Sequence, residues 1–320
     1  MKIAFLYEHP TWSEKLIDCF HNNDINLQLI NIDELTFDTD SFDIDFDLLI
    51  NRVNVMPYER RDSAIVFHTL HFLNWLELSG VRIINGARTH YIGSSKAVQN
   101  GIFSMLNLDT PRAIAIYKNK DALKAAEKIG FPVIIKPNIG GSGSNIARFN
   151  SSVELKLAID QKLINLGVDG SGLVQKYIYS DGYVYRVEIL GDELFYSTKQ
   201  KIVENKFNYC ATEGCNIDTR NTEQEEEFDF CVFESSHQIQ LHDVPQEILQ
   251  QVIKIIKKTR ADFGGIEYII NRETGKPCYF DFNPYSNFVS HGETFLGFSP
   301  EQRFVDFIKN LCYCPADDSI

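Results

Sequence analysis

The sequence predicts an α/β protein whose first part is built on a parallel sheet. Short apolar runs that suit buried strands alternate there with segments of helical periodicity, which indicates parallel strands joined by crossover helices. The chain has 320 residues, of which 44% are hydrophobic and 23% charged, a composition typical of globular proteins with a sizeable core. This length corresponds to two or three structural units.

The first predicted unit, residues 1–92, opens with a buried strand at 2–7. A helix follows at 12–22, with one apolar face made by Trp12, Leu16, Ile17 and Phe20. Further strands are predicted at 27–32, 47–51 and 81–84, and a long helix at 62–79. Glu8-His9-Pro10 stands where a dinucleotide site would have a glycine-rich turn, which argues against a dehydrogenase.

Two further units are predicted at 93–175 and 176–315. Their expected helices are 95–106, 120–129, 152–166, 246–261 and 300–311. Their expected strands are 113–117, 133–136, 172–177 and a strand-like stretch at 182–202, followed near the end by a hairpin. The polar, acidic stretch 204–227 predicts a mobile loop.

Charge and cysteine content exclude several classes of protein. The formal net charge is -13, which argues against a large surface for nucleic acid or anionic membranes. The seven cysteines are odd in number and form no CxxC pair, so we expect structural thiols rather than a disulfide or zinc framework. No signal peptide is evident, and no run reaches the roughly 18 apolar residues of a membrane span, so a cytoplasmic location is expected.

A lysine followed at once by a glycine-rich loop is the first motif with chemical meaning. The strand at 133–136 ends in Lys136, and Gly140, Gly141, Ser142, Gly143 and Ser144 follow. Glycines let backbone N–H groups approach phosphate oxygens, and lysine supplies a positive charge. The segment lacks the Gly-Lys-Ser/Thr ending of a Walker loop. A phosphate-binding loop and a flexible hairpin loop are the two interpretations.

The second motif is a pair of strand-like runs that carries two acids. If Asn271 pairs with Pro277 across a five-residue loop, Glu267 lies directly opposite Asp281, and Asn283 shares their face. Facing carboxylates repel unless a proton or a cation lies between them. Two carboxylates and an amide oxygen suit Mg²⁺, which takes its remaining ligands from water and phosphate. The alternative is a surface hairpin with incidental acids.

Together these motifs resemble the ATP-grasp superfamily, and most closely its RimK-type branch of amino-acid ligases. The resemblance covers about residues 1–312. It is carried by Lys96, Lys136 with its glycine loop, the segment Leu173–Ile178, Arg186, and Glu267 with Asp281-Phe-Asn283-Pro284. It implies an ATP-grasp fold with an N-terminal Rossmann-like domain preceding it.

The resemblance also implies a role for each motif. Lys96 and Lys136 would contact the ATP phosphates, and Gly140–Ser144 would form a lid over them. The backbone around Gln175, Lys176, Tyr177 and Ile178 would read adenine. Glu267, Asp281 and Asn283 would hold Mg²⁺ or Mn²⁺, while Arg186 and Lys199 would face the transferring phosphoryl group and the tetrahedral intermediate.

Several positions depart from the family pattern or have another interpretation. Val184 stands where related ligases carry the acid that meets the ribose, and Asp181 is the candidate to replace it. A Cys210–Cys215 segment replaces an arginine-rich stretch that often contributes to the acceptor site. His68 and His71 have no third partner for a metal site, so we expect packing or surface roles. His291 has either a substrate-facing or a structural role.

The resulting hypothesis is an ATP- and Mg²⁺-dependent ligase that joins a carboxylate to an amine through an acyl-phosphate. The alternative is a non-catalytic ATP-binding regulator or scaffold that keeps the fold. Expected partners are small amino acids or peptides, with a peptide or protein as a further acceptor class. No nucleic-acid or membrane partner is expected, and the protein is either a monomer or a homo-oligomer.

Overall fold

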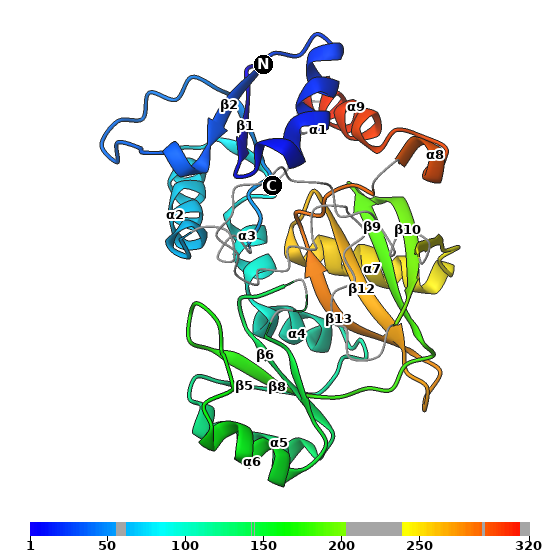
Figure 1. The fold of residues 1–320 in the computed structure, drawn as a ribbon. Coiled ribbons are helices and arrows are strands. Elements are labelled where there is room, and N and C mark those ends of the chain that lie inside the picture. The colour runs from blue at the N-terminus through cyan, green and yellow to red at the C-terminus, as the bar shows by residue number, and fades with distance from the viewer. Residues whose placement is uncertain (56–61, 142, 144, 203–238, 290–291, 314–320) are drawn as a thin grey trace, which may run out of the picture.

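The computed structural model describes residues 1–55, 62–141, 143, 145–202, 239–289 and 292–313, which form three sheets with flanking helices (Figure 1). The acidic stretch 204–227, Ser142, Ser144 and His291 lie outside the described residues. Within the described part, Cys19, Cys278 and Cys312 are free thiols. None of the helices described is long and apolar enough to cross a membrane.

The N-terminal unit is a parallel sheet, as the alternation of strands and helices predicts. Its strands are β1 (Ile3–Tyr7), β2 (Leu27–Asn31), β3 (Leu48–Asn51) and β4 (Arg82–Ile84), in the order β2-β1-β3-β4. Its helices are α1 (Pro10–Asn22), η1 (Ile32–Glu34) and α2 (Ala64–Leu78). Helix α1 begins earlier than predicted because Pro10 suits the first helical turn, where its missing N–H needs no partner.

Two helices connect this unit to the rest of the chain. Helix α3 (Ala87–Ser94) was not predicted, whereas α4 (Lys96–Met105) matches the predicted helix closely. The side chain of Ser95 caps α4 by accepting a hydrogen bond from the Val98 N–H. This cap places Lys96 at the first turn of α4.

The second unit is antiparallel. Its strands are β5 (Ala113–Ile116), β6 (Val133–Pro137), β7 (Ala147–Phe149) and β8 (Gly172–Lys176), in the order β5-β8-β6-β7. Its helices are η3 (Asn119–Asp121), α5 (Ala122–Ile129) and α6 (Ser152–Asp160). Helix α6 ends earlier than predicted, because Lys162 adopts a left-handed backbone (φ 58°) that a helix cannot continue.

The third unit is a five-stranded antiparallel sheet. Its strands are β9 (Tyr183–Leu190), β10 (Glu193–Lys201), β11 (Ile239–Leu241), β12 (Phe263–Ile270) and β13 (Pro277–Asn283), in the order β11-β10-β9-β12-β13. Its helices are α7 (Gln246–Thr259), α8 (Gly292–Leu296) and α9 (Pro300–Tyr313). One apolar cluster joins α4 and α7 to this sheet. Helix α9 returns to pack beside α1, so the end of the chain closes on the N-terminal unit (Figure 1).

The hairpin β12–β13 contains a bulge that matters for the site. Ile270, rather than the predicted Asn271, pairs with Pro277, and Tyr268 pairs with Tyr279. Phe280 is then an extra residue on β13, and beyond it Glu267 pairs with Asp281, as predicted. The predicted pairing is therefore wrong at the turn and confirmed at the acids. Without the bulge, the register at the turn would place Phe280 opposite Glu267.

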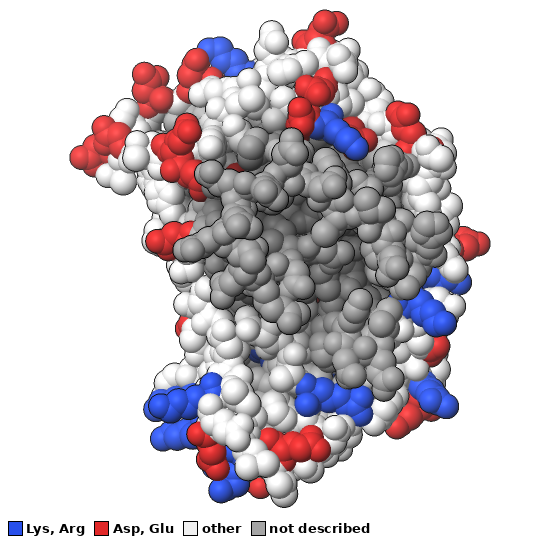
Figure 2. Space-filling model, in the orientation of Figure 1, with Lys and Arg blue, Asp and Glu red and all other residues white. Residues whose placement is uncertain are grey.

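Charge is distributed unevenly over the surface. On the face drawn in Figure 2, acidic side chains gather over the N-terminal unit, whereas lysines and arginines are prominent over the second unit. The acidic part includes exposed side chains in the connection before β3, namely Asp33, Glu34, Asp38, Asp40, Asp43, Asp45 and Asp47.

Candidate active site

A pocket of about 250 Å³ lies where the three units meet, and most of the residues singled out in the sequence line it. The structure brings together Lys96, Lys136, Gly140, Gly141, Gly143, Gln175, Lys176, Tyr177, Ile178, Arg186, Glu267, Asp281 and Asn283. Asp181 and Lys199 are not among the lining residues. The residues brought together come from α4, β6, β8, β9, the hairpin β12–β13 and the segments that follow β6 and β8.

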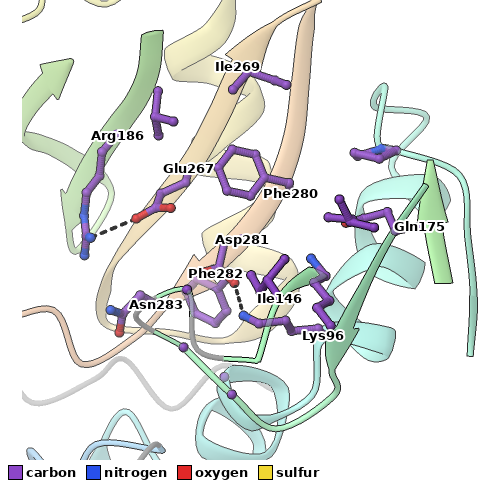
Figure 3. Close-up of a pocket in the computed structure, with 18 of the residues that line it drawn as sticks. Lys96, Ile146, Gln175, Arg186, Glu267, Ile269, Phe280, Asp281, Phe282 and Asn283 are labelled. Carbon is purple, nitrogen blue, oxygen red and sulfur yellow. Dashed lines mark hydrogen bonds and ion pairs between the residues drawn. The ribbon is translucent and has the colours of Figure 1, made fainter. Parts of the chain in front are cut away.

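The two lysines lie beside the acids of the hairpin. Lys96 Nζ donates a hydrogen bond to Asp281 Oδ1 at 2.7 Å (Figure 3). Lys136 is only 5% exposed, and burial together with the neighbouring charge of Lys96 lowers its pKa to about 7. Lys96 and Lys136 have little solvent around them, so a bound anion would stabilise their charged forms. We call this pair of lysines the cationic floor of the pocket.

The hairpin acids have opposite electrostatic surroundings. Burial, with the nearby negative charges of Asp281 and Glu188, raises the pKa of Glu267 to about 7 although Arg186 opposes the shift. Burial would also raise the pKa of Asp281, but Lys96 and Lys136 outweigh it and hold that pKa below its ordinary value. A cation at the pair would therefore favour two ionised carboxylates.

The donor set fits magnesium. Glu267, Asp281 and Asn283 supply only oxygen donors, the ligands that Mg²⁺ prefers. Each carboxylate now uses one oxygen with a protein cation, Glu267 with Arg186 and Asp281 with Lys96 (Figure 3). Among the residues that the structure describes, no three His, Cys, Asp or Glu side chains come together as a metal site.

Arg186 lies at the centre of a hydrogen-bonded cluster. Its Nε donates to Glu188 Oε1 at 2.6 Å, Nη1 donates to Glu267 Oε1 at 2.9 Å, and Nη2 donates to Ser286 Oγ. Burial alone would lower the pKa of Arg186, but the two carboxylates hold it above its ordinary value. A guanidinium has five N–H donors, so two remain for a ligand in the pocket.

Comparison with known proteins identifies this arrangement. Residues 96–193 match the family described as "Carbamoyl-phosphate synthase L chain, ATP binding domain". The fold matches the crystal structure of a RimK domain ATP-grasp protein from Sphaerobacter thermophilus with a TM-score of 0.67, covering 96% of this chain and 99% of that one at 14% identity. The chain has an ATP-grasp fold.

Two relatives of known name share part of the chain. The coenzyme gamma-F420-2:alpha-L-glutamate ligase of Methanocaldococcus jannaschii is 28% identical over 148 residues, which cover 45% of this chain and 49% of the relative. The glutamate–LysW ligase ArgX of Sulfolobus acidocaldarius is 26% identical over 178 residues, covering 52% and 63%. The chain thus spans 49% and 63% of the length of these two relatives.

The far end of the ATP-grasp pocket is mostly apolar. Figure 3 shows Ile269 and Phe280 there, away from Lys96 and Asn283. The other apolar lining residues include Ile134, Ile178 and Val184, and such side chains suit the faces of a planar base. The N–H groups of Lys176 and Tyr177 already donate to carbonyl oxygens of Arg112 and Pro132, at 2.8 and 3.1 Å. Of the predicted adenine-reading backbone, these two donors are therefore occupied within the protein.

Two predicted residues point elsewhere. Asp181 Oδ2 accepts a hydrogen bond from the Tyr185 hydroxyl at 2.6 Å, outside the pocket. Lys199 Nζ lies 5.2 Å from the centre of the Tyr183 ring, on the sheet face opposite Thr198, which lines the pocket. The structure brings neither side chain to the site. His68, set aside as a metal ligand, contacts the Leu35 carbonyl oxygen through Nε2 at 3.0 Å.

Sequence reasoning missed Glu188 and Ser286. Both contact Arg186, and Glu188 also lines the pocket. For Glu188 a signal was present, because a residue two positions from Arg186 on a strand shares its face. No comparable signal marks Ser286, which lies in the irregular segment after β13.

Proposed function

We propose that this protein is an ATP- and Mg²⁺-dependent ligase that joins a carboxylate to an amine through an acyl-phosphate. One observation carries the proposal, namely that Lys96, Lys136 and Arg186 line a single pocket together with the three oxygen donors of the hairpin. Phosphate cations, metal ligands and an oxyanion donor are the groups that such a reaction needs in one place.

The phosphates of ATP bind at the cationic floor. Lys96 and Lys136 neutralise phosphate oxygens, and the backbone N–H groups of Gly140, Gly141 and Gly143, which line the same pocket, bind them from the other side. Glu267, Asp281 and Asn283 would hold a magnesium ion, which would supply charge neutralisation at the phosphoryl group. The γ-phosphorus forms a bond to a carboxylate oxygen as its bond to the bridging oxygen of ADP breaks.

Arg186 stabilises the second step. An amine nitrogen attacks the acyl carbon, the C–N bond forms, and the carbonyl oxygen becomes an oxyanion. The two remaining N–H donors of Arg186 stabilise that charge in a site with little water. The C–O bond to phosphate then breaks, phosphate leaves with the electron pair, and the amine loses its proton, leaving an amide or peptide bond.

The base of the glycine loop is firmly held, which supports its role as a lid over a reactive intermediate. Ile139 is 5% exposed and packs into the apolar core of the N-terminal unit with Val53 and Ile65. Lid closure from such an anchor would exclude water, which would otherwise hydrolyse the acyl-phosphate. We infer that the substrates are amino acids or peptides. The acceptor is a small molecule of this kind or a larger peptide or protein.

The test is ATP turnover that depends on two added substrates. ADP and phosphate are measured with pools of amino acids and peptides, and the coupled product is identified by mass spectrometry. Release that requires both an acid and an amine supports the ligase. Nucleotide binding without turnover under every pool would support the non-catalytic regulator instead.

A metal-ligand variant adds a residue-level check. Asp281→Asn should abolish turnover and leave the protein folded, because the amide keeps the size of the side chain. Asp192→Asn is the matched control, since Asp192 is 67% exposed and pairs with Lys257 away from the pocket. Near-normal turnover in Asp281→Asn would remove Asp281 from the mechanism.

A further inference from the structure

Glu188 is a buried carboxylate in the pocket for which the steps above have no use. It is 4% exposed and lines the pocket from β9, two residues after Arg186. Nucleotide phosphates repel a carboxylate, and the metal set is complete without it. A buried acid is costly unless it is paired, and within the described residues Arg186 pairs with only one of the two oxygens of Glu188.

The geometry leaves one oxygen of Glu188 available. Oε1 accepts from Arg186 Nε at 2.6 Å. No hydrogen bond to Oε2 is found within the described part of the chain. The carboxylate lies against the Cα of Gly265, where a Cβ atom would come within 2.5 Å of Oε1 and 2.9 Å of Oε2. Glycine at this position on β12 therefore makes the room that the carboxylate occupies.

The position of Glu188 along β9 separates it from the nucleotide. Val184, Arg186 and Glu188 line the pocket in turn, and Val184 belongs to the apolar end that suits a base. Glu188 is thus at the opposite end, beyond the guanidinium that stabilises the oxyanion. Tyr196 and Thr198 of β10 line the pocket beside it and add hydroxyl groups rather than a competing charge.

One nearby cation must be considered. Arg52 is buried, and the charge of Glu188 partly offsets the lowering of its pKa by burial. Arg52 Nη2, however, donates to the Ser286 carbonyl oxygen at 2.9 Å, and no ion pair within 4.0 Å joins it to Glu188 among the described residues. Arg52 therefore does not occupy the open oxygen.

We propose that Glu188 binds the attacking amine of the acceptor, with Oε2 accepting an N–H from its ammonium group before that group loses one proton to the buffer and the neutral nitrogen attacks. The inference rests on the proposed ligase function and names the chemistry that one end of the site recognises. A nitrogen at Oε2 lies beside the Arg186 donors, where the acyl carbon of the intermediate would be held. Glu188 then both orients Arg186 through Oε1 and seats the nucleophile through Oε2.

The competing explanation is that Glu188 only orients Arg186. Glu188→Gln separates the two roles, because the amide oxygen can still accept from Arg186 Nε whereas the amide NH₂ replaces the oxygen that faces the amine. Glu193→Gln is the control, since Glu193 is 84% exposed on β10 and its nearest ion-pair contact is Arg303, outside the pocket.

The experiment compares two nucleophiles in the full-length protein. Hydroxylamine, largely uncharged in mildly alkaline buffer, traps the acyl-phosphate as a hydroxamate, whereas the amines of the common amino acids are largely protonated. Each amino acid serves as the acid with hydroxylamine, and the panel then serves as amine acceptors. kcat/KM is measured for both nucleophiles in wild type, Glu188→Gln and Glu193→Gln.

We expect Glu188→Gln to lower kcat/KM for the protonated amine at least about tenfold more than for hydroxylamine, the effect of losing one charge-assisted hydrogen bond. Equal losses with both nucleophiles would show that Glu188 acts only through Arg186 and would overturn the inference. So would equal rates in wild type and variant. A wild-type protein that forms neither hydroxamate nor amide with ATP would instead overturn the ligase function itself.

Discussion

Replacement of Arg186 by lysine tests the central cluster most directly. The guanidinium makes three side-chain hydrogen bonds in fixed directions, to Glu188, Glu267 and Ser286. A lysine ammonium keeps the positive charge but lacks the planar fork, so it cannot reach all three partners and still face the pocket. The substitution therefore removes the directed hydrogen bonds of the guanidinium while it conserves the positive charge.

The size of the effect follows from burial. The side chains of Arg186, Glu188 and Glu267 are 12%, 5% and 12% exposed, so solvent does little to replace a lost contact. Each charge-assisted hydrogen bond lost costs about 1.5–3 kcal/mol of folding free energy. Loss of an oxyanion donor costs about 100- to 1,000-fold in kcat. For Arg186→Lys we therefore expect the free energy of unfolding to fall by about 1.5–3 kcal/mol or more. We expect kcat to fall by about 100- to 1,000-fold.

The rate of amide product formation and thermal unfolding measure the two effects separately, because ADP forms in the step before the oxyanion. Arg303→Lys is the matched control, because Arg303 donates to the Leu194 and Phe195 carbonyl oxygens at 3.1 and 3.3 Å outside the pocket. The control should keep its kcat. If Arg186→Lys turned over within about threefold of wild type, the oxyanion role argued from the geometry would be wrong.

Three further predictions address the surroundings of the site. Burial lowers the pKa of Lys136 to about 7, and a bound phosphate favours its charged form. Nucleotide binding should therefore take up a proton above pH 7 and weaken as pH rises. Calorimetry in buffers of different ionisation enthalpy measures this uptake, which should vanish in Lys136→Met. Gly265→Ala should displace the Glu188 carboxylate, because the new Cβ would come within 2.5 Å of Oε1, and should lower kcat while leaving nucleotide affinity near wild type in a binding titration. Tyr285→Phe removes a buried hydroxyl that accepts from Asn51 Nδ2 at 2.8 Å, and should lower the free energy of unfolding by about 1–3 kcal/mol; an unchanged denaturant midpoint would show that this network is not holding the N-terminal unit to the site.

Local sequence patterns predicted the elements that carry the site. The parallel N-terminal sheet followed from alternating strands and helices, and the facing of Glu267 and Asp281 followed from the hairpin. The predicted pairing at the turn was wrong by one residue, because Pro277 pairs with Ile270 and not with Asn271. The extra residue Phe280 restores the predicted pairing of Glu267 with Asp281. A bulge depends on packing across the sheet rather than on local composition, so the residue pattern of the hairpin did not predict it.

The sequence by itself determined which chemical groups the predicted strands carry. These are a lysine before a glycine loop, two acids and an amide on one face of a hairpin, and an arginine on a long strand. Tertiary structure alone decided which side chains share the pocket. Thr198 pairs with Arg186 across β9 and β10, so alternation turns Lys199 to the opposite face, while Glu188 joins the cluster. Strand periodicity specifies that two faces exist, but only the register and the packing of three units determine which face encloses the pocket.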